Sequence, residues 1–133
     1  MNITSIIIVA CGGGIGAVLR FAIANLFSTS TTGSFPFGTI FINISGCVCI
    51  GLVAALLLGP LSEHREILKP LVIIGVLGGF TTYSTFALDS ITLLQNGKFG
   101  LFCIYLLISN TLGILFAYLC FTVGSNIFVA TPN

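Results

Sequence analysis

The 133-residue chain is too apolar for a water-soluble protein, because 56% of its residues are hydrophobic, 5% are charged and its mean hydropathy is +1.20. Soluble proteins carry about 25% charged residues. The composition therefore indicates an integral membrane protein without a soluble catalytic domain, and we do not expect an enzyme. The formal net charge of +1 argues against nucleic-acid binding, which needs clustered Lys and Arg.

Hydropathy predicts a single membrane domain over residues 1–133. A helix that crosses a bilayer needs about 20 apolar residues, so the chain has room for four spans and little else. The expected spans cover about residues 3–27, 37–58, 71–94 and 99–128. We therefore predict an all-α integral membrane fold of four transmembrane helices.

The first span contains one charge, Arg20, and no carboxylate. Gly12 and Gly16 are four residues apart, which predicts a face of small residues that another helix approaches closely. The stretch from Ser28 to Phe35 is rich in Ser, Thr and Gly, which favours a loop. The second span should then begin near Pro36, because proline suits the first turn of a helix.

The second span has no charges but contains a polar pair, Thr39 and Asn43. Four residues apart, they lie on the same face of a helix, and Gly46 follows three residues later. An asparagine in hydrocarbon is costly unless it is hydrogen-bonded. Asn43 therefore either bonds a neighbouring helix or offers a donor to a ligand, and the residues alone leave both interpretations open.

A polar run from Gly78 to Phe86 lies in the middle of the third span. Each of its two adjacent glycines lowers helix stability by about 1 kcal/mol relative to alanine, and its Ser and Thr hydroxyls can bond a loosened backbone. We predict a helix broken near the bilayer midplane, with an ion site at the break, because freed backbone groups in lipid need protein or a polar cavity. The alternative, a lone strand, would have no ladder partners.

Polar residues also mark the end of the third span and the face of the fourth. Asp89 is either a carboxylate that reaches towards the interface or a vestibule or pairing residue. Tyr105, Ser109 and Gly113 recur every four residues, which predicts a stripe that faces protein. The five cysteines all lie in apolar segments, so we expect small buried side chains there.

The positive charges are evenly divided, with Arg65 and Lys69 on one side of the membrane and Arg20 and Lys98 on the other. The positive-inside rule therefore gives no preferred orientation. Such a chain can insert both ways, and two opposite copies can pair about a twofold axis in the membrane plane. The charges predict an antiparallel dual-topology homodimer with a polar site at its midplane interface.

Three segments together resemble the Fluc (CrcB) fluoride channels: Gly13 to Phe21, Gly38 to Gly46 and Gly75 to Phe86. They follow the family's order and spacing, and the resemblance covers nearly the whole chain. It implies a multi-pass protein of the prokaryotic plasma (inner) membrane, a dual-topology homodimer with two fluoride pores, and a structural sodium ion at the dimer axis. Fluoride would leave the cytoplasm by passive electrodiffusion, which protects against fluoride toxicity.

The resemblance also implies residue roles. Asn43 matches the pore asparagine, whereas Tyr83 and Phe86 match two ring-lining phenylalanines, so Tyr83 departs from the family pattern. Asp89 stands where relatives often have Glu. The expected site residues are Thr39, Asn43, Thr82, Tyr83, Ser84, Phe86 and Ser109 in the fluoride pore, Arg20 in the vestibule, and Gly78 and Thr81 as main-chain carbonyl ligands of sodium.

The chemistry of fluoride agrees with such a pore. Fluoride is small and strongly hydrated, and hydroxyl and amide donors with the positive edges of aromatic rings can replace its water. The main alternative is a small dual-topology multidrug exporter, but proton coupling would need a carboxylate in the first span, which has none. A structural subunit of a larger membrane complex would explain the glycine-rich faces but not the polar run.

Overall fold

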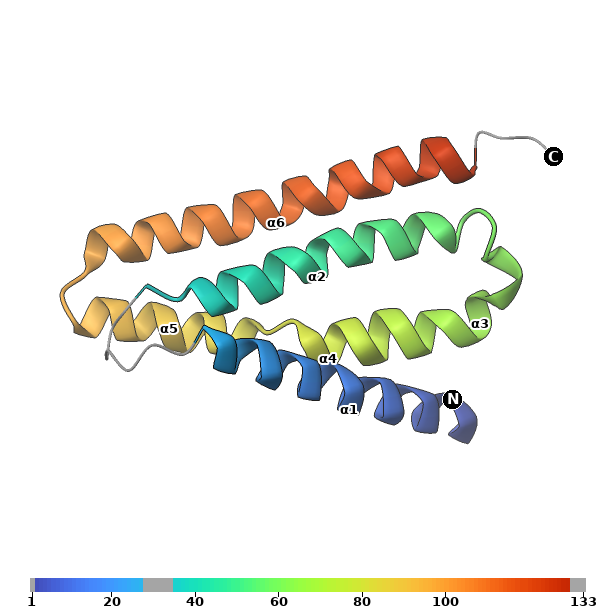
Figure 1. Cartoon of the computed structure of the whole chain (residues 1–133), viewed down its shortest axis with the longest axis horizontal. Coiled ribbons are helices and arrows are strands. Elements are labelled where there is room, and N and C mark those ends of the chain that lie inside the picture. The colour runs from blue at the N-terminus through green and yellow to red at the C-terminus, as the bar shows by residue number, and fades with distance from the viewer. Residues whose placement is uncertain (1, 28–34, 130–133) are drawn as a thin grey trace.

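The computed structural model describes residues 2–27 and 35–129, and this part of the chain is helical without a strand. Its four passes alternate in direction, so that α1 begins and α6 ends at the same end of the bundle (Figure 1). The passes are α1 (Ile3–Leu26), α2 (Phe37–Leu56), a composite third pass (Ser62–Gln95) and α6 (Phe99–Phe128), each long and apolar enough to cross a membrane. The predicted all-α fold with four membrane-spanning helices is confirmed.

The third pass consists of five pieces rather than one regular helix. Its middle piece is a π-helix that contains Pro70, which has no N–H to donate. Thr81 (φ −78°, ψ 159°) and Thr82 (φ −150°, ψ 122°) have extended backbone between the last two pieces. In chain order, the pieces are η1 (Ser62–His64), α3 (Arg65–Leu68), η2 (Lys69–Leu77), α4 (Gly78–Phe80) and α5 (Tyr83–Gln95).

Two threonines explain why α4 ends and α5 begins where they do. The backbone N–H and the Oγ1 of Thr81 both donate to the Leu77 carbonyl, at 3.0 and 2.9 Å, which closes the last turn of α4. Thr82 is the N-cap of α5, because its Oγ1 accepts from the backbone N–H of Thr85 at 3.2 Å. A threonine cap typically contributes about 1 kcal/mol.

Glycines let α1 pack directly on η2 and α4. A Cβ added to Gly12 would clash with the carbonyl of Leu71, and one added to Gly16 would clash with the carbonyl of Val76. The small-residue face predicted at Gly12 and Gly16 is therefore confirmed. It holds α1 against the half of the third pass that precedes the extended threonines.

The helix α2 lies between α6 and the third pass (Figure 1). A Cβ on Gly51 would clash with the Ala117 carbonyl of α6, so these two backbones are in close contact. A Cβ on Gly46 would clash with the methyl group of Thr81, so α2 also lies directly against the extended threonines. This packing brings the polar residues of α2 beside the interruption in the third pass.

The outside of the bundle is apolar, as a lipid-facing surface should be. Large hydrophobic side chains such as Val18 on α1 and Ile114 on α6 are exposed. The expectation that all five cysteines are buried is wrong for Cys11 and Cys49, which are exposed, because an apolar side chain in a membrane protein is as stable against lipid as against protein. The loop predicted from Ser28 to Phe35 lies, except for Phe35, outside the described residues.

Candidate functional site

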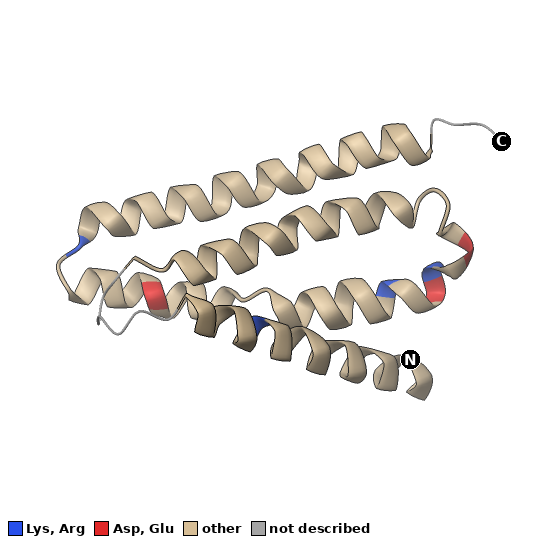
Figure 2. Ribbon diagram, viewed as in Figure 1, with Lys and Arg blue, Asp and Glu red and all other residues tan. Residues whose placement is uncertain are grey.

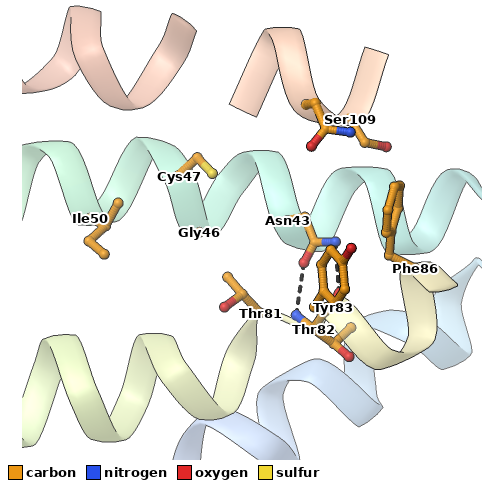
Figure 3. A pocket seen from close by; sticks show the side chains of 10 residues that line it. Asn43, Gly46, Cys47, Ile50, Thr81, Thr82, Tyr83, Phe86 and Ser109 are labelled. Carbon is orange, nitrogen blue, oxygen red and sulfur yellow. Dashed lines mark hydrogen bonds between the residues drawn. The ribbon is translucent and has the colours of Figure 1, made fainter. Parts of the chain in front are cut away.

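Asn43 of α2 holds the extended backbone at Thr82 through two hydrogen bonds (Figure 3). Its Oδ1 accepts from the Thr82 N–H at 2.9 Å, and its Nδ2 donates to the Thr82 carbonyl at 3.1 Å. These bonds satisfy the N–H and C=O of Thr82, which lack helical partners, and buried backbone groups in a low-dielectric surrounding need such partners. The Asn43 side chain therefore links α2 to the third pass. Because an amide group has two N–H donors, the second N–H of Asn43 remains for a ligand.

A pocket of about 280 Å³ opens between α2, α6 and the extended threonines. Side chains from α2, α5, α6 and the extended threonines converge on it (Figure 3). Five of the predicted pore residues line this pocket: Asn43, Thr82, Tyr83, Phe86 and Ser109. Thr81, predicted as a sodium ligand, lines it as well, together with Gly46, Cys47, Ile50 and Asn110.

The hydroxyl of Ser109 gives this pocket an unmet hydrogen-bonding group. Its Oγ is the one buried side-chain polar atom without a hydrogen-bond partner in the part of the chain that the structure describes. A buried polar group left unbonded costs about 1–3 kcal/mol. A ligand that accepts a hydrogen bond in this pocket would satisfy the Ser109 hydroxyl.

Aromatic rings form another side of the pocket. The rings of Tyr83 and Phe86 have centroids 5.6 Å apart, and on its other side Phe86 packs on Tyr105 at 5.0 Å. Phe86 is 7% exposed and Tyr105 is fully buried, whereas Tyr83 is 80% exposed in the single chain. Phe86 is thus fixed by its neighbours, and Tyr83 stands at the open side of the pocket.

Two predicted pore residues, Thr39 and Ser84, do not line the pocket. The Thr39 Oγ1 donates to Asp89 Oδ2 at 2.6 Å, and the Tyr105 hydroxyl donates to the same oxygen at 3.2 Å. Ser84 Oγ and Thr82 Oγ1 are hydrogen-bonded at 3.1 Å. Asp89 is therefore a pairing residue that joins α2, α5 and α6, and the ring of Phe86 packs between its partner Tyr105 and the pocket.

Cys47 and Asn110 also line the pocket but are not among the site residues predicted from the sequence. Cys47 lies four residues after Asn43 and so on the same face of α2, which the helical period could have shown. Asn110 is a polar residue inside a membrane span, a feature that generally marks a functional position. In this structure its Nδ2 donates to the Leu106 carbonyl at 2.8 Å.

Arg20 and Gly78 lie away from this pocket. Arg20, on α1, is half-buried and makes no ion pair within the described residues. In a continuous helix the Gly78 carbonyl would accept from the Thr82 N–H, which donates instead to Asn43. In the same way the Thr81 carbonyl loses the Thr85 N–H to the Thr82 hydroxyl. Both carbonyls are hard oxygen donors, which suits an ion such as sodium.

The passes and this pocket define a small four-span membrane protein with a hydrogen-bond-donating site beside an interruption in its third pass. A family model described as CrcB-like protein, Camphor Resistance (CrcB), matches residues 7–121. The chain belongs to this family, as the three motifs predicted.

Curated relatives named fluoride-specific ion channel FluC cover most of the chain. The protein from Paracoccus denitrificans is 40% identical over 120 residues, which are 90% of this chain and 94% of the relative. The protein from Magnetococcus marinus is 42% identical over 116 residues, or 87% and 94% of the two chains. The protein from Aquifex aeolicus is 39% identical over 119 residues, or 90% and 95%.

Proposed function

We propose that this protein is a fluoride-selective ion channel, not an enzyme, through which fluoride leaves the cytoplasm by passive electrodiffusion. The single observation in the structure that supports this most directly is the buried, unpartnered Ser109 hydroxyl in the pocket beside Asn43. Its relatives carry the name fluoride-specific ion channel FluC. The channel protects the cell against fluoride toxicity.

The pocket replaces the water of fluoride with fixed donors. The Ser109 hydroxyl, the second N–H of Asn43 and the positive ring edges of Tyr83 and Phe86 take that role. No carboxylate lines the pocket, and the nearby Asp89 is bonded to Thr39 and Tyr105 beyond the ring of Phe86. A fluoride ion therefore meets donors before it meets a negative charge.

Three further threonine and serine hydroxyls complete the proposed pore. Thr82 and Ser84 bond each other and keep the extended segment in place at the pocket wall. Thr39, whose Oγ1 donates to Asp89, contributes to the pore by holding this carboxylate beyond the ring of Phe86, away from the pocket. Arg20 attracts the anion in the vestibule, because a half-buried guanidinium without an acid partner in the described residues leaves its charge available.

The functional unit that we propose is an antiparallel, dual-topology homodimer in the prokaryotic plasma membrane. Each protomer is one domain over residues 1–133, and each of two pores is lined by both subunits. Two features support a second copy at the interruption: Tyr83 is 80% exposed beside the pocket, and a Cβ on Gly78 would have only the Ile73 carbonyl, 3.7 Å away, within 4 Å. The interruption of the third helix then lies near the bilayer midplane.

A structural sodium ion at the axis of this dimer would be held by the main-chain carbonyls of Gly78 and Thr81 from both subunits. Both carbonyls lose their helical partners, because the amides that would bond them bond Asn43 and the Thr82 hydroxyl instead. When bound, the ion supplies a positive charge that neutralises carbonyl dipoles brought together at the axis. Asn43 and Thr82 contribute to this site by keeping the two carbonyls free.

Fluoride efflux from liposomes that contain only the purified protein tests this function. We expect release of fluoride, retention of chloride, and loss of fluoride flux in Ser109→Ala, whose folded state should be as stable as the wild type or more stable because the orphan hydroxyl is gone. Ser125→Ala is the matched control, since this serine is on the same helix but bonds the Thr122 carbonyl. Undiminished flux in Ser109→Ala would remove this hydroxyl from the pore, and no fluoride release by the wild type would refute the channel.

A further inference from the structure

A second pocket, of about 180 Å³, lies at the end of the bundle where α2 leads into the third pass. Its walls are apolar: Ala54, Leu57 and Leu58 come from α2 and the residues after it, Ile73 from η2 and Phe121 from α6. Two cations, Arg65 and Lys69, complete the lining. The pocket therefore joins a positive rim to a hydrocarbon-like interior.

The two cations are available to a ligand. They are four residues apart on a continuous helical segment, so they lie on one face, and both are exposed. Acidic residues lie beside them (Figure 2), Glu63 in η1 and Glu66 in α3, but neither Arg65 nor Lys69 makes an ion pair within the described residues. Two positive charges therefore remain without a partner beside apolar walls.

We propose that this pocket binds an anionic phospholipid. The headgroup phosphate lies between Arg65 and Lys69, and the upper part of an acyl chain covers Ala54, Leu57 and Phe121. Basic pockets between membrane helices are typical sites for anionic headgroups. A soluble phosphate would match the two cations but leave the apolar walls uncovered, which is why we assign a lipid rather than a free anion.

The charge pattern also argues against a second protein copy as the occupant. In the antiparallel dimer proposed above, the partner brings the opposite end of its bundle to this membrane face. That end carries Lys98, the N-cap residue of α6 and another cation, which does not complement Arg65 and Lys69. The dimer would instead have one such pocket at each membrane face and bind one anionic lipid in each leaflet, a stoichiometry that depends on the proposed dimer.

Native mass spectrometry of the purified protein with added phosphatidylglycerol or phosphatidylcholine tests the site. We expect phosphatidylglycerol to be retained in preference to phosphatidylcholine. Retention should fall roughly tenfold or more in the Arg65→Gln, Lys69→Gln double variant, since each basic residue near the surface contributes to lipid binding. Lys69→Gln alone should lower lipid retention more than Lys98→Gln, which removes one charge at the N-cap of α6, at the other end of the bundle.

Two further variants keep the test decisive if the double variant misfolds. Arg65→Lys with Lys69→Arg preserves both charges and should retain the lipid, whereas Ala54→Phe fills the apolar part of the pocket without changing charge and should release it. Equal retention of the two lipids, or unchanged retention in Ala54→Phe and Lys69→Gln, would overturn the proposal. Displacement of phosphatidylglycerol by inorganic phosphate at equal concentration would also overturn it, in favour of a free-anion site.

Fluoride efflux provides a separate readout. If the Arg65→Gln, Lys69→Gln double variant and Ala54→Phe lose the lipid but retain fluoride efflux in phosphatidylcholine vesicles, the lipid site and the pore are independent. Loss of efflux in Lys69→Gln with unchanged lipid retention would overturn the lipid site and assign the cation to anion entry. A wild-type protein that binds phosphatidylglycerol but conducts no fluoride would refute the proposed function and leave the lipid site standing.

Discussion

Asn43 contacts the backbone of Thr82 with both ends of its amide, and the proposed function gives it a second role in the pore. The sequence left open whether an asparagine here bonds a helix or a ligand. The structure shows the first role, and we propose that the second amide N–H binds fluoride. A substitution at Asn43 should therefore change stability as well as flux.

Asn43→Asp should change both the stability and the flux. The new side chain can still accept from the Thr82 N–H, but it loses the donor to the Thr82 carbonyl and places a carboxylate at the pocket. We expect fluoride efflux to stop and the free energy of unfolding to fall by about 1–3 kcal/mol, the cost of an unbonded buried carbonyl. Liposome efflux and thermal unfolding of the dimer check this, and undiminished efflux would remove Asn43 from the pore.

Tyr83 and Phe86 test whether ring edges or a hydroxyl bind the anion. If ring edges are sufficient, Tyr83→Phe should keep fluoride flux within roughly tenfold of wild type, about 1.4 kcal/mol in barrier height. Phe86→Ile should be far worse, because it keeps apolar bulk but removes the positive edge. Flux and size-exclusion profiles are measured for both. An intact Tyr83→Phe dimer without flux would show that the hydroxyl has become the donor, and normal flux in Phe86→Ile would contradict the role of ring edges.

At the scale of the element, the two adjacent glycines of α4 have different surroundings. A Cβ on Gly79 would lie 2.5 Å from the Gly13 carbonyl of α1, whereas a Cβ on Gly78 would meet only the Ile73 carbonyl at 3.7 Å. Gly79 is thus required by packing inside one protomer. Gly78 is open in the single chain, where we propose that the second copy and the sodium ion lie.

Substitution of Gly79 should therefore affect the stability of the protomer, whereas substitution of Gly78 should affect dimer assembly. Gly79→Ala should destabilise the protomer by displacing α1, and thermal unfolding should show this whatever the sodium concentration. Gly78→Val should leave the protomer folded but prevent dimer assembly, because it fills the space proposed for the axis. Size exclusion and cross-linking distinguish the two outcomes, and a normal Gly78→Val dimer with normal flux would place the ion elsewhere.

The helices could be predicted from the sequence more completely than the site. An apolar segment long enough to cross a bilayer is visible along the chain, so the four passes followed from hydropathy. The pocket depends on how each helix is rotated. Asn43, Phe86 and Ser109 were identified as unusual residues or by resemblance, but the pairing of Thr39 with Asp89 and the contribution of Cys47 follow from the packing of α2 against its neighbours.

At the scale of the whole molecule, the charges lie at both ends of the bundle. Figure 2 shows Lys and Arg at both ends of the bundle and within α1. Lys98 is the N-cap of α6 at one end, Arg65 and Lys69 are in α3 and η2 at the other, and Arg20 is within α1. This balance leads us to predict insertion in both orientations. Cytoplasmic and periplasmic reporters fused after Asn133 should both be active.

A charge variant gives this topology prediction a control. Gln95→Lys with Asn96→Lys adds two positive charges beside Lys98 and should silence one of the two reporters, because the end with more Lys and Arg then stays in the cytoplasm. Activity of a single reporter in the unmodified protein would contradict dual topology. Equal activity of both reporters in the charge variant would mean that the charges do not set the orientation.

The reversal potential of the purified protein in a planar bilayer tests passive, selective conduction of fluoride most directly. With a tenfold fluoride gradient and equal pH on both sides, we expect a reversal potential that approaches the fluoride equilibrium value, about 59 mV for one charge. A superimposed pH gradient should not move it. A reversal potential near zero, one of the opposite sign, or one that follows the proton gradient would contradict a fluoride-selective channel.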